Sequence, residues 1–410
     1  MLHRLQSDYS NKEISFRFKE REISLFLSQA LFSSYDIDRG SRLLLTSLSK
    51  KLNFQNIHTV LDIGCGVGTL GLALKSRYTD LHISMQDRDA LAVTFSRLNA
   101  ERNGLEDIHF HGGLAFHELP RKSFDLIVSN IPAKVGMKVL RFFFTSMVDF
   151  LSSRGTAAVV VVNRISDLSR DLIEEAGGTI TLTQHFAGHT VMHFNRAIPP
   201  TGPSSEPVLQ PDKLEPYFRS TCSFQVSDFF YSLDTVWGEA DFDNPPFTAR
   251  LVVKILRSLP VEGALLFWNP GQGHIPVLTL YHARESGRKI DRIYCAGRNA
   301  LALEICRHNL IHYAEYRGEI KLLHLPDTLA LKSHEERSIQ FCIVECEHLA
   351  GVPIPDGVFE GAEKILEPGG ILIITGKSAH FSHFDTRNRP FSRIAEKKHK
   401  GYKVVSLKRL

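Results

Sequence analysis

Apolar residues recur along the first half of the chain with two different spacings. Short apolar runs such as 60–63 and 156–162 have the length of strands buried on both faces. Longer segments such as 90–103 carry apolar residues at helical spacing. Strands are expected at 60–63, 81–86, 108–111, 124–128 and 156–162, and helices at 68–77 and 90–103. Strands and helices in alternation predict an α/β fold, a doubly wound parallel sheet covered by helices.

Two segments upstream and one downstream frame this domain. Residues 14–18 and 23–28 alternate apolar and polar positions, which predicts a small antiparallel hairpin, and a helix is expected from about Ser41. The segment 198–216 contains six prolines, which exclude a helix interior and a central strand. We therefore expect a first domain over 1–197 with an N-terminal β extension, a Pro-rich linker over 198–216, and a second domain over 217–410.

The second half repeats the first in the same order. Residues 263–280, GALLFWNPGQGHIPVLTL, can be aligned with 58–74, HTVLDIGCGVGTLGLAL, as strand, Gly-containing turn and helix. The further matches are 292–310 with 82–100, 341–351 with 124–134, and 365–376 with 150–163. A shared order over such a length predicts a tandem duplication of one Rossmann-like domain.

Composition and charge narrow the function only slightly. Apolar residues make up 43% and charged residues 23% of the 410 residues, so packed cores are expected. The net charge of +4 is too small to establish a nucleic-acid partner. With no membrane-length apolar run and no signal peptide, the chain is expected to be soluble and cytoplasmic. The six cysteines form no Cys-x-x-Cys pair, and no metal site is expected. The histidines at 185, 189 and 193 belong to a strand-like stretch rather than to a ligand-bearing helix.

The turn after the first strand of the sheet has the composition of a cofactor loop. It reads Asp62-Ile63-Gly64-Cys65-Gly66-Val67-Gly68, and its glycines allow a ligand to approach the backbone at a helix N-terminus. Glycines at 66, 68 and 71 also fit the dinucleotide pattern G-x-G-x-x-G. Asp62 favours a methyl donor, since a carboxylate attracts the cationic end of S-adenosylmethionine and repels a pyrophosphate. Asp87, at the end of the next strand, is expected to accept the ribose hydroxyls.

These motifs carry a resemblance to a known family. VLDIGCGVGTLGLAL, with QDRDALAV, SNIPAK and the upstream FSSYDIDRGSRLLL, resembles the methyltransferase small-domain family of class I S-adenosylmethionine-dependent enzymes. The similarity is greatest to bacterial ribosomal RNA guanine-N2 methyltransferases, which are also tandem duplications. In that family the second copy is active, whereas here the first copy keeps the motifs. The resemblance implies S-adenosyl-L-methionine as cofactor and RNA, such as ribosomal RNA, as partner. The cofactor-binding residues it implies are Ser41, Asp62, Gly64, Cys65, Gly66, Gly68, Asp87, Arg88 and Gly113.

The candidate catalytic residues, Asn130, Ile131 and Pro132, follow the strand 124–128. The family pattern is Asn-Pro-Pro-Phe or Tyr, in which the Asn oxygen and the next carbonyl accept hydrogen bonds from a planar exocyclic amine and the aromatic ring stacks on the base. Here Ile131 replaces a proline and Ala133 replaces the ring. Phe116, His117 or the run 142–144 could supply a ring instead, although core packing explains each of them more simply. Lys134 is expected to be solvated.

The second copy has lost the chemistry of the first. It keeps Gly271 and Gly273, but Trp268-Asn269 is expected where the acid belongs, and Gly297-Arg298 lies opposite Asp87. We expect this copy to bind no S-adenosylmethionine and to act as a docking or stability platform. The sequence 243–247, Asp-Asn-Pro-Pro-Phe, imitates the catalytic motif but precedes the Gly-containing turn, so it is interpreted as a helix cap.

The prediction is a methyltransferase acting on an exocyclic amine, with RNA guanine-N2 as the acceptor that the resemblance implies. A protein or small-molecule amine remains open as the acceptor, and so does a non-catalytic module that binds RNA or protein. An NAD-dependent oxidoreductase is a weaker alternative, because Asp62 disfavours a pyrophosphate. The stretch 387–410 holds nine Lys or Arg residues against Glu396, which indicates either a footprint for phosphates or a solvated, mobile tail.

Overall fold

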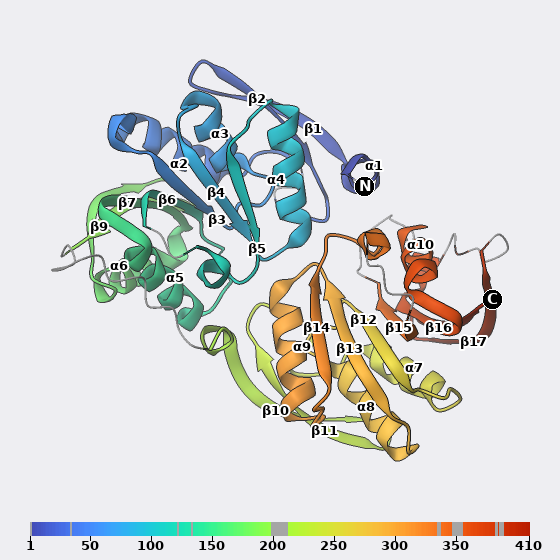
Figure 1. Ribbon diagram of the computed structural model, residues 1–410. Coiled ribbons are helices and arrows are strands. Elements are labelled where there is room, and N and C mark those ends of the chain that lie inside the picture. The colour runs from blue at the N-terminus through green and yellow to red at the C-terminus, as the bar shows by residue number, and fades with distance from the viewer. Residues whose placement is uncertain are drawn as a thin grey trace. The chain divides into compact units, whose positions relative to one another are not determined.

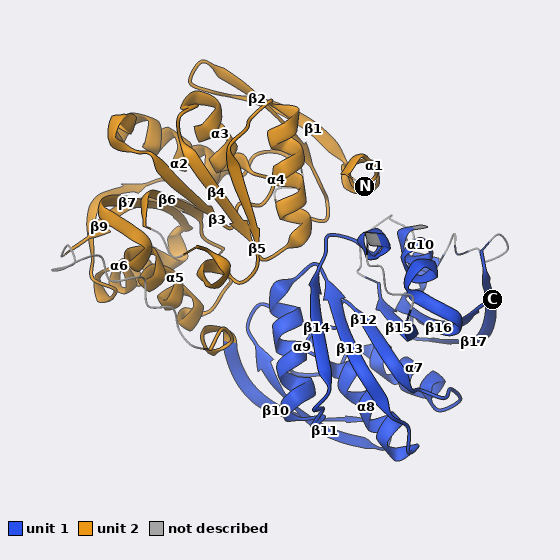
Figure 2. Cartoon of the chain, in the orientation of Figure 1, with its two compact units in different colours: residues 1, 218–410 blue, residues 2–217 orange. Residues whose placement is uncertain are grey.

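The structure, a computed structural model, shows two compact units (Figures 1 and 2). It describes residues 2–32, 35–120, 123–132, 134–197, 212–333, 338–346, 356–381, 384 and 389–410. The first unit spans residues 2–217 and the second spans 218–410. Most of the expected linker, 198–211, and Ala133 of the catalytic motif lie outside the described residues. The end of the expected linker, 212–216, belongs to the first unit, and so does Tyr217, which was expected to begin the second domain.

The first unit is built around a seven-stranded sheet in the order β5-β4-β3-β6-β7-β9-β8. Its strands are β1 Lys12–Phe18, β2 Arg21–Leu27, β3 Thr59–Ile63, β4 His82–Asp87, β5 Ile108–Gly112, β6 Phe124–Asn130, β7 Leu151–Val162, β8 Gly178–His185 and β9 His189–Arg196. Its α-helices are α1 Leu2–Tyr9, α2 Arg39–Lys51, α3 Thr69–Arg77, α4 Ala90–Arg102, α5 Met137–Phe150 and α6 Ser166–Glu175. Strands β5, β4, β3, β6 and β7 pair in parallel, as the sequence predicted. The sheet is mixed, because β9 pairs antiparallel with β7 and with β8.

Helices cover both faces of this sheet, so the parallel strands are apolar on both sides. One core joins the sheet to α2, α3, α4 and the hairpin β1–β2, and the other joins it to α5 and α6. Successive residues of a strand point to opposite faces, so Val60 enters the first core and Leu61 the second. Parallel strands end at one edge of the sheet, and this brings Asp62, Asp87 and Asn130 to the same edge.

The second unit repeats this architecture. Its sheet has the order β14-β13-β12-β15-β16-β18-β17, which matches the first sheet strand for strand, and the hairpin β10–β11 corresponds to β1–β2. The strands are β10 Phe218–Val226, β11 Phe229–Val236, β12 Gly263–Trp268, β13 Ile290–Gly297, β14 Glu319–His324, β15 Ile339–Glu345, β16 Leu366–Lys377, β17 Phe391–His399 and β18 Tyr402–Arg409. The α-helices are α7 Phe247–Leu256, α8 His274–Glu285, α9 Ala300–His312 and α10 Asp356–Ile365. The predicted pair of Rossmann-like domains is confirmed.

One buried asparagine in each unit shows how closely the two copies agree. Asn99 on α4 donates from Nδ2 to the carbonyl of Val67 at 2.8 Å and to the carbonyl of Phe26 in the hairpin at 3.1 Å. Asn309 on α9 makes the same pair of bonds, to the carbonyls of Gln272 at 2.8 Å and Asp234 at 2.9 Å. In both units the amide therefore fastens the Gly-containing turn and the hairpin to one helix.

Two expectations about the second unit need correction. The basic stretch is not a free tail, because 391–409 forms the paired strands β17 and β18. Lysines on an edge strand such as β17 hinder pairing with another chain, so sheet protection accounts for part of this charge. The segment 243–247 provides no side-chain cap: α7 begins at Phe247 directly after Pro246, and Asp243 pairs with Arg219 at 2.7 Å instead.

The described residues offer neither a membrane-spanning helix nor a metal site. None of their helices is long and apolar enough to cross a membrane. No group of three His, Cys, Asp or Glu side chains comes together among them as a metal site would require. His193 lies in β9 and bonds to Ser47 at 3.0 Å, as befits a core residue, and burial lowers its pKa to about 4.

Candidate active site

The glycine-rich loop between β3 and α3 has a backbone that only glycine adopts easily. Gly64, Gly66 and Gly68 have φ angles of 73°, 57° and 95°. The backbone N–H groups of Gly64 and Cys65 donate to the carbonyl of Gln86 on β4, at 2.8 and 3.0 Å, and so fix the turn to the sheet. A Cβ atom at Gly64 or Gly66 would meet nothing within 4 Å, so the loop borders open space in which a ligand can lie against the backbone.

Asp62 is a buried carboxylate with one free oxygen. Its side chain is 1% exposed, and its Oδ2 accepts a hydrogen bond from the N–H of Gly71 at 2.8 Å. Its Oδ1 finds no donor among the described residues. Burial raises the pKa of Asp62 to about 7, and the negative charge of Asp87 adds to the shift. A cationic ligand group would supply the missing partner, so the ammonium end of S-adenosylmethionine fits this position.

Asp87 stands at the end of β4 with both oxygens turned toward backbone donors. Oδ2 accepts from the N–H of Gly66 at 2.9 Å and Oδ1 from the N–H of Asp89 at 2.9 Å. Each carboxylate oxygen has a further lone pair, which suits a ribose hydroxyl. Burial raises the pKa of Asp87. The cap of α4 is Asp89, which accepts from the N–H of Leu91 at 2.8 Å, so Asp87 is not needed as a cap.

The loop after β5 completes the edge of the cofactor site. The carbonyl of Gly113 accepts from Gln86 Nε2 at 2.6 Å, and the N–H of Leu114 donates to Glu118 Oε2 at 2.6 Å. A Cβ atom at Gly113 would lie 2.6 Å from the Glu118 side chain, so glycine is required there. Arg88 follows Asp87 directly, and its charge acts on the Asp87 carboxylate. The structure thus brings the loops that hold Asp62, Asp87 and Gly113 to one edge of the sheet.

Asn130, the last residue of β6, is held in one orientation by helix α2. Its Nδ2 donates to Asp38 Oδ2 at 2.7 Å and to Ser41 Oγ at 3.1 Å. Its Oδ1 accepts from none of the described residues, so this oxygen remains available for an amine. A Cβ atom at Gly40 would lie 2.8 Å from Asp38 Oδ2 and 3.3 Å from the Asn130 amide, so glycine permits the contact between helix and strand.

Asp38 is a site residue that sequence reasoning missed. Its Oδ2 also accepts from the N–H groups of Gly40 and Ser41 at 2.8 and 3.3 Å, so the same atom caps α2 and orients Asn130. The signal was present in Asp38-Arg39-Gly40-Ser41, where an acid precedes a helix start. Ser41, expected to bind the cofactor, makes its side-chain contact with Asn130, and its role toward the cofactor stays a prediction.

The residues after Asn130 leave the sheet without supplying a ring. Ile131 is 3% exposed, and its N–H donates to the carbonyl of Val160 at 3.0 Å, while Pro132 is exposed. The alternative rings pack in or against the core, the simpler interpretation of them, and Phe143 is partly buried against the same core. Phe116, Phe142 and Phe144 are buried, and His117 stacks on Phe142 with ring centroids 5.2 Å apart.

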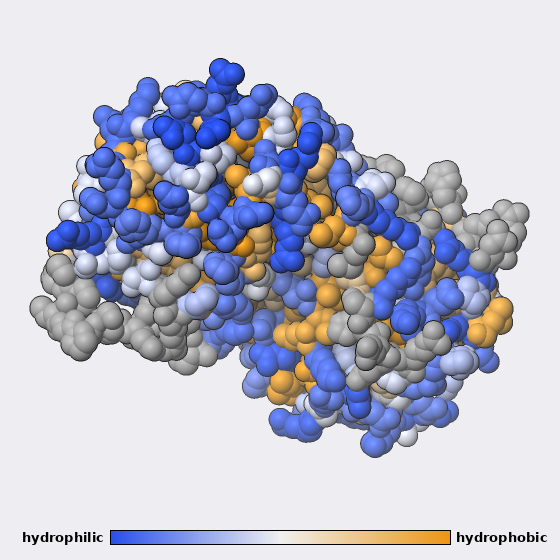
Figure 3. Space-filling view, turned by 45° about the horizontal axis from the view of Figure 1, so that its top comes forward, coloured by the Kyte–Doolittle hydropathy of each residue, from blue (hydrophilic) through white to orange (hydrophobic). Residues whose placement is uncertain are grey.

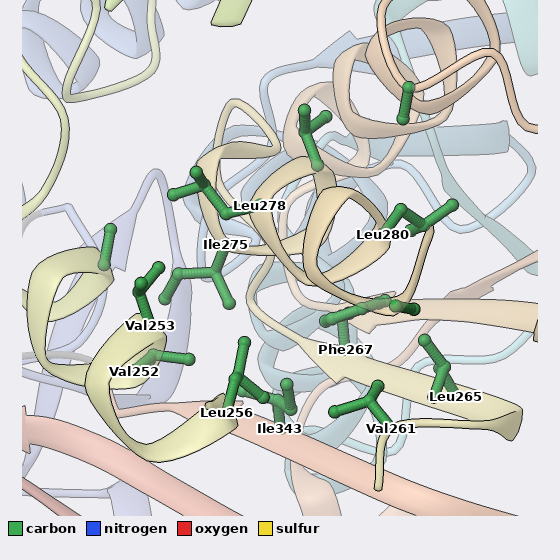
Figure 4. Close-up of a cluster of buried hydrophobic side chains, with 14 of the residues drawn as sticks. Val252, Val253, Leu256, Val261, Leu265, Phe267, Ile275, Leu278, Leu280 and Ile343 are labelled. Atoms are coloured by element: carbon green, nitrogen blue, oxygen red, sulfur yellow. The ribbon is translucent and has the colours of Figure 1, made fainter. Parts of the chain in front are cut away.

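Strand register shows which residues of the second unit replace the cofactor-binding acids. Ile63 pairs with Gln86 and Trp268 pairs with Ala296, so Phe267, not Trp268 or Asn269, takes the place of Asp62. The sequence alignment was wrong by one position there. Figure 4 shows Phe267 in the hydrophobic core of the second unit. Gly297 takes the place of Asp87, as expected.

The glycine-containing turn of the second unit keeps the backbone conformation of the first but lacks its hydrogen bond to a buried acid. Gly273 has a φ of 94°, close to the 95° of Gly68, and both precede the first residue of a helix. Counting from these glycines, Pro276 stands where Gly71 donates its N–H to Asp62. Proline has no N–H, so both members of that hydrogen bond are missing in the second unit.

Comparison with known proteins identifies the family of the first unit. Residues 22–193 match the protein family described as Methyltransferase small domain. The first unit belongs to the methyltransferase small-domain family. It is an S-adenosylmethionine-dependent methyltransferase domain, which decides against the NAD-dependent alternative.

Two sequence relatives show how far the likeness extends. The "Uncharacterized protein YbxB" of Bacillus subtilis (strain 168) is 29% identical over 186 residues, which cover 45% of this chain and 91% of that protein. The "Ribosomal RNA small subunit methyltransferase C" of Actinobacillus pleuropneumoniae serotype 7 (strain AP76) is 32% identical over 130 residues, 32% of this chain and 38% of that protein. The chain thus aligns with about two-fifths of the length of this methyltransferase.

One solved structure resembles the whole chain. It is the T. thermophilus 16S rRNA N2 methyltransferase RsmC, solved in complex with AdoMet and guanosine. The TM-score is 0.59 at 15% sequence identity, and the match covers 99% of this chain and 100% of that one. At this identity the likeness establishes the two-unit fold.

Proposed function

We propose that the first unit methylates an exocyclic amine of RNA, with N2 of a guanine in ribosomal RNA as the acceptor. The observation that carries the proposal is the orientation of Asn130. Its Nδ2 is bound by Asp38 and Ser41, which fixes the amide and leaves Oδ1 as its acceptor. A hydrogen-bond acceptor fixed in this way suits a planar amine that donates from its own N–H.

The residues of the site divide into two groups by task. When bound, S-adenosylmethionine supplies an electrophilic methyl group on a positively charged sulfur. Asp62 would hold its ammonium group, Asp87 its ribose, and the turn 64–68 would let it lie against the backbone. Asn130 Oδ1 and the carbonyl of Ile131 would accept the two N–H bonds of the amine and so aim the nitrogen lone pair at the methyl group. Positioning of this kind needs no strong base, and the released proton can pass to solvent.

Two findings support RNA as the substrate class. A relative named a ribosomal RNA methyltransferase is 32% identical over 130 residues, and RsmC shares the fold of both units. The second unit lacks the acids and the N–H that the first unit turns toward the cofactor. We infer that it serves as a docking or stability platform rather than as a second catalytic centre.

The proposal is tested by transfer of labelled methyl groups from S-adenosylmethionine to unmodified total RNA by the full chain. N2-methylguanosine in the digested RNA is the expected product. Asn130→Ala should lower the rate at least a hundredfold while the affinity for S-adenosylhomocysteine stays within about twofold. Glu345→Gln is the matched control. Glu345 lies in the second unit at the strand position that Asn130 has in the first, and the Glu345→Gln variant should transfer methyl groups at the wild-type rate.

Other outcomes would replace the proposal. A parallel assay in cell extract, followed by separate nuclease and protease digestion, distinguishes the acceptor classes. Label that only protease releases would make a protein the substrate. Cofactor binding without label in any fraction would identify a binding module.

A further inference from the structure

Among the described residues of the first unit, three large apolar side chains are exposed. They are Phe32, Tyr35 and Met137, which are 75%, 68% and 55% exposed. Single exposed apolar residues are ordinary on a protein surface. Here Phe32 and Tyr35 precede Asp38 by six and three residues, and Met137, the first residue of α5, follows Asn130 by seven, so all three are near in sequence to the Asp38–Asn130 contact of the candidate active site.

The loop that carries Tyr35 is tied to the catalytic asparagine through Asp38. Tyr35 precedes Asp38 by three residues, so their Cα atoms are at most about 11 Å apart. Asp38 in turn bonds to Asn130 at 2.7 Å. The backbone of the loop is held from both sides: Lys12 Nζ donates to the carbonyl of Tyr35 at 2.9 Å, and Ile37, 5% exposed, anchors the loop in the core.

On the other side of the contact, the exposed apolar residue is Met137, the first residue of α5. It follows Asn130 by seven residues, and the turn before it is made by Gly136 with a φ of 81°. A thioether adapts its shape readily to a flat ring. The segment before Asp38 therefore carries exposed aromatic residues, and the start of the helix after Asn130 carries a flexible apolar residue.

The face of the protein drawn in Figure 3 is mostly hydrophilic, and apolar residues occupy smaller areas of it. Exposed aromatic rings beside an active site are more simply explained by a ligand that covers them than by folding. The catalytic loop itself offers no ring after Asn130, and the rings of Phe116, Phe142 and Phe144 are buried.

We propose that Tyr35, together with Phe32, stacks on the acceptor purine and replaces the ring that the catalytic loop lacks. The inference rests on the proposed function, since it requires a base as the acceptor. Stacking fixes the plane of the base, and a fixed plane is what allows Asn130 to hold the exocyclic amine with its lone pair toward the methyl group. Met137 then packs near the base from the start of α5.

A fluorescent base tests the proposal directly. The probe is a single-stranded RNA oligonucleotide with one 2-aminopurine, whose amino group has the position of N2 in guanine and whose emission is quenched by stacking. It is added to the full chain saturated with S-adenosylhomocysteine. Wild type and Tyr35→Phe should quench the emission. Tyr35→Ala should lose most of the quenching and bind the probe about tenfold more weakly, and Phe32→Ala/Tyr35→Ala should lose more.

Kinetics separate stacking from a general structural effect. Tyr35→Ala should raise the KM for RNA about tenfold, and Tyr35→Phe should restore it, while the affinity for S-adenosylhomocysteine stays unchanged in both variants. Asn130→Ala should keep the quenching although it loses methyl transfer. Equal quenching and equal KM in the wild type and the double alanine variant would overturn the inference, as would a wild type that does not quench the probe.

The failure of the proposed function has a different signature. A wild type that quenches the probe but transfers no methyl group to RNA would refute the proposed reaction and leave the stacking surface in place. A wild type that methylates RNA with Tyr35 and Phe32 both replaced, at an unchanged KM, would refute the stacking surface alone.

Discussion

Asp62→Asn should make the first unit more stable and bind its cofactor less well. In the wild type the carboxylate is buried, one oxygen accepts from the N–H of Gly71, and the other has no donor among the described residues. An asparagine has the same shape and keeps an acceptor for Gly71, so the loop can retain its geometry. The substitution removes the negative charge, which is unfavourable in the core and favourable next to a cation.

The sign and size of the stability change follow from the pKa of Asp62. Burial raises this pKa from 3.8 to about 7. Below pH 3.8 the carboxyl is protonated in the folded and unfolded states and has no effect. Between 3.8 and about 7 the folded state keeps a proton that the unfolded state releases, so stability falls by about 1.4 kcal/mol per pH unit. The loss of unfolding free energy caused by the buried Asp62 carboxyl is about 4 kcal/mol at pH 8 and about 2 kcal/mol at pH 5.5.

The asparagine recovers part of this penalty. Its buried NH2 group takes the place of the unpaired oxygen and costs about 1–3 kcal/mol, so a net gain of about 1–3 kcal/mol is expected at pH 8. For a unit of this size the gain corresponds to a rise of about 2–10 °C in the Tm of the first unit. The advantage of the variant should shrink by about 2 kcal/mol between pH 8 and pH 5.5, because only the wild type titrates in that range.

Cofactor binding should change in the opposite direction. Loss of a charge-assisted hydrogen bond to the ammonium group costs about 1.5–3 kcal/mol, which is about a 10- to 150-fold weaker Kd for S-adenosylhomocysteine at pH 7.5. In the wild type the affinity should fall as pH drops below 7, whereas in the variant it should be nearly independent of pH. Calorimetry measures both quantities on the same samples.

The reasoning would be refuted by a variant that is less stable than the wild type at pH 8 yet binds the cofactor equally well. Such a result would mean that Asp62 serves the loop rather than the ligand. A variant with a raised Tm and an unchanged Kd would show that the carboxylate is strained by burial but does not contact the ammonium group.

Three further substitutions test other contacts. Asp38→Ala should lower kcat at least tenfold with little change in the Kd for cofactor, because Asn130 loses a hydrogen-bond acceptor that orients it. Single-turnover rates and calorimetry measure these two quantities. Asp38→Asn keeps an acceptor and should lower kcat less. Asn99→Ala should destabilise the first unit by about 3 kcal/mol in urea unfolding, since it leaves buried backbone groups of the hairpin and turn unpaired. Phe267→Asp should destabilise the second unit by more than about 4 kcal/mol without creating cofactor binding, because Pro276 has no N–H to share; thermal scans with and without S-adenosylhomocysteine test both parts.

The periodicity of the chain was enough to predict most of the fold. Strands buried on both faces are near-continuous apolar runs, and the segment 156–162 was found for that reason, while 60–63, 108–111 and 124–128 were found as short segments with apolar residues outside the expected helices. The edge strand β17 was missed because edge strands carry many charges, and β18 was missed because Lys403, Lys408 and Arg409 lie near its two ends, so the stretch 387–410 looked like a tail. The sequence alignment placed Trp268 opposite Asp62, where the structure has Phe267. The spacing of the glycines did not define which residue of the preceding strand corresponds to Asp62.

Side chains that act through long-range contacts were harder to predict. Asp62 and Asp87 were identified because each lies at the carboxyl end of a parallel strand, and these ends meet at the same sheet edge. Asp38 belongs to a helix start far away in sequence, and only the folded chain brings it to Asn130. Likewise, the sequence left the apolar run 142–144 open as a source of rings, with core packing as the simpler explanation, and only the burial of Phe142 and Phe144 decides for the core. The sequence reveals residues whose role follows from local geometry more readily than those whose role depends on packing.

The two units show that the shape of a cofactor loop and its chemistry can be separated. The turn in the second unit keeps the left-handed glycine before the helix and the clamping asparagine, Asn309, so its backbone does not depend on a ligand. It lacks the two polar groups that bond to each other in the first unit. Phe267 takes the place of the buried acid Asp62, and Pro276 takes the place of Gly71, whose N–H donates to that acid. Replacing a buried carboxylate by a phenyl ring removes a charge from the core and adds apolar contacts. The retained Asp62 is therefore unfavourable for folding in the first unit, and this cost supports its proposed role in binding the cofactor.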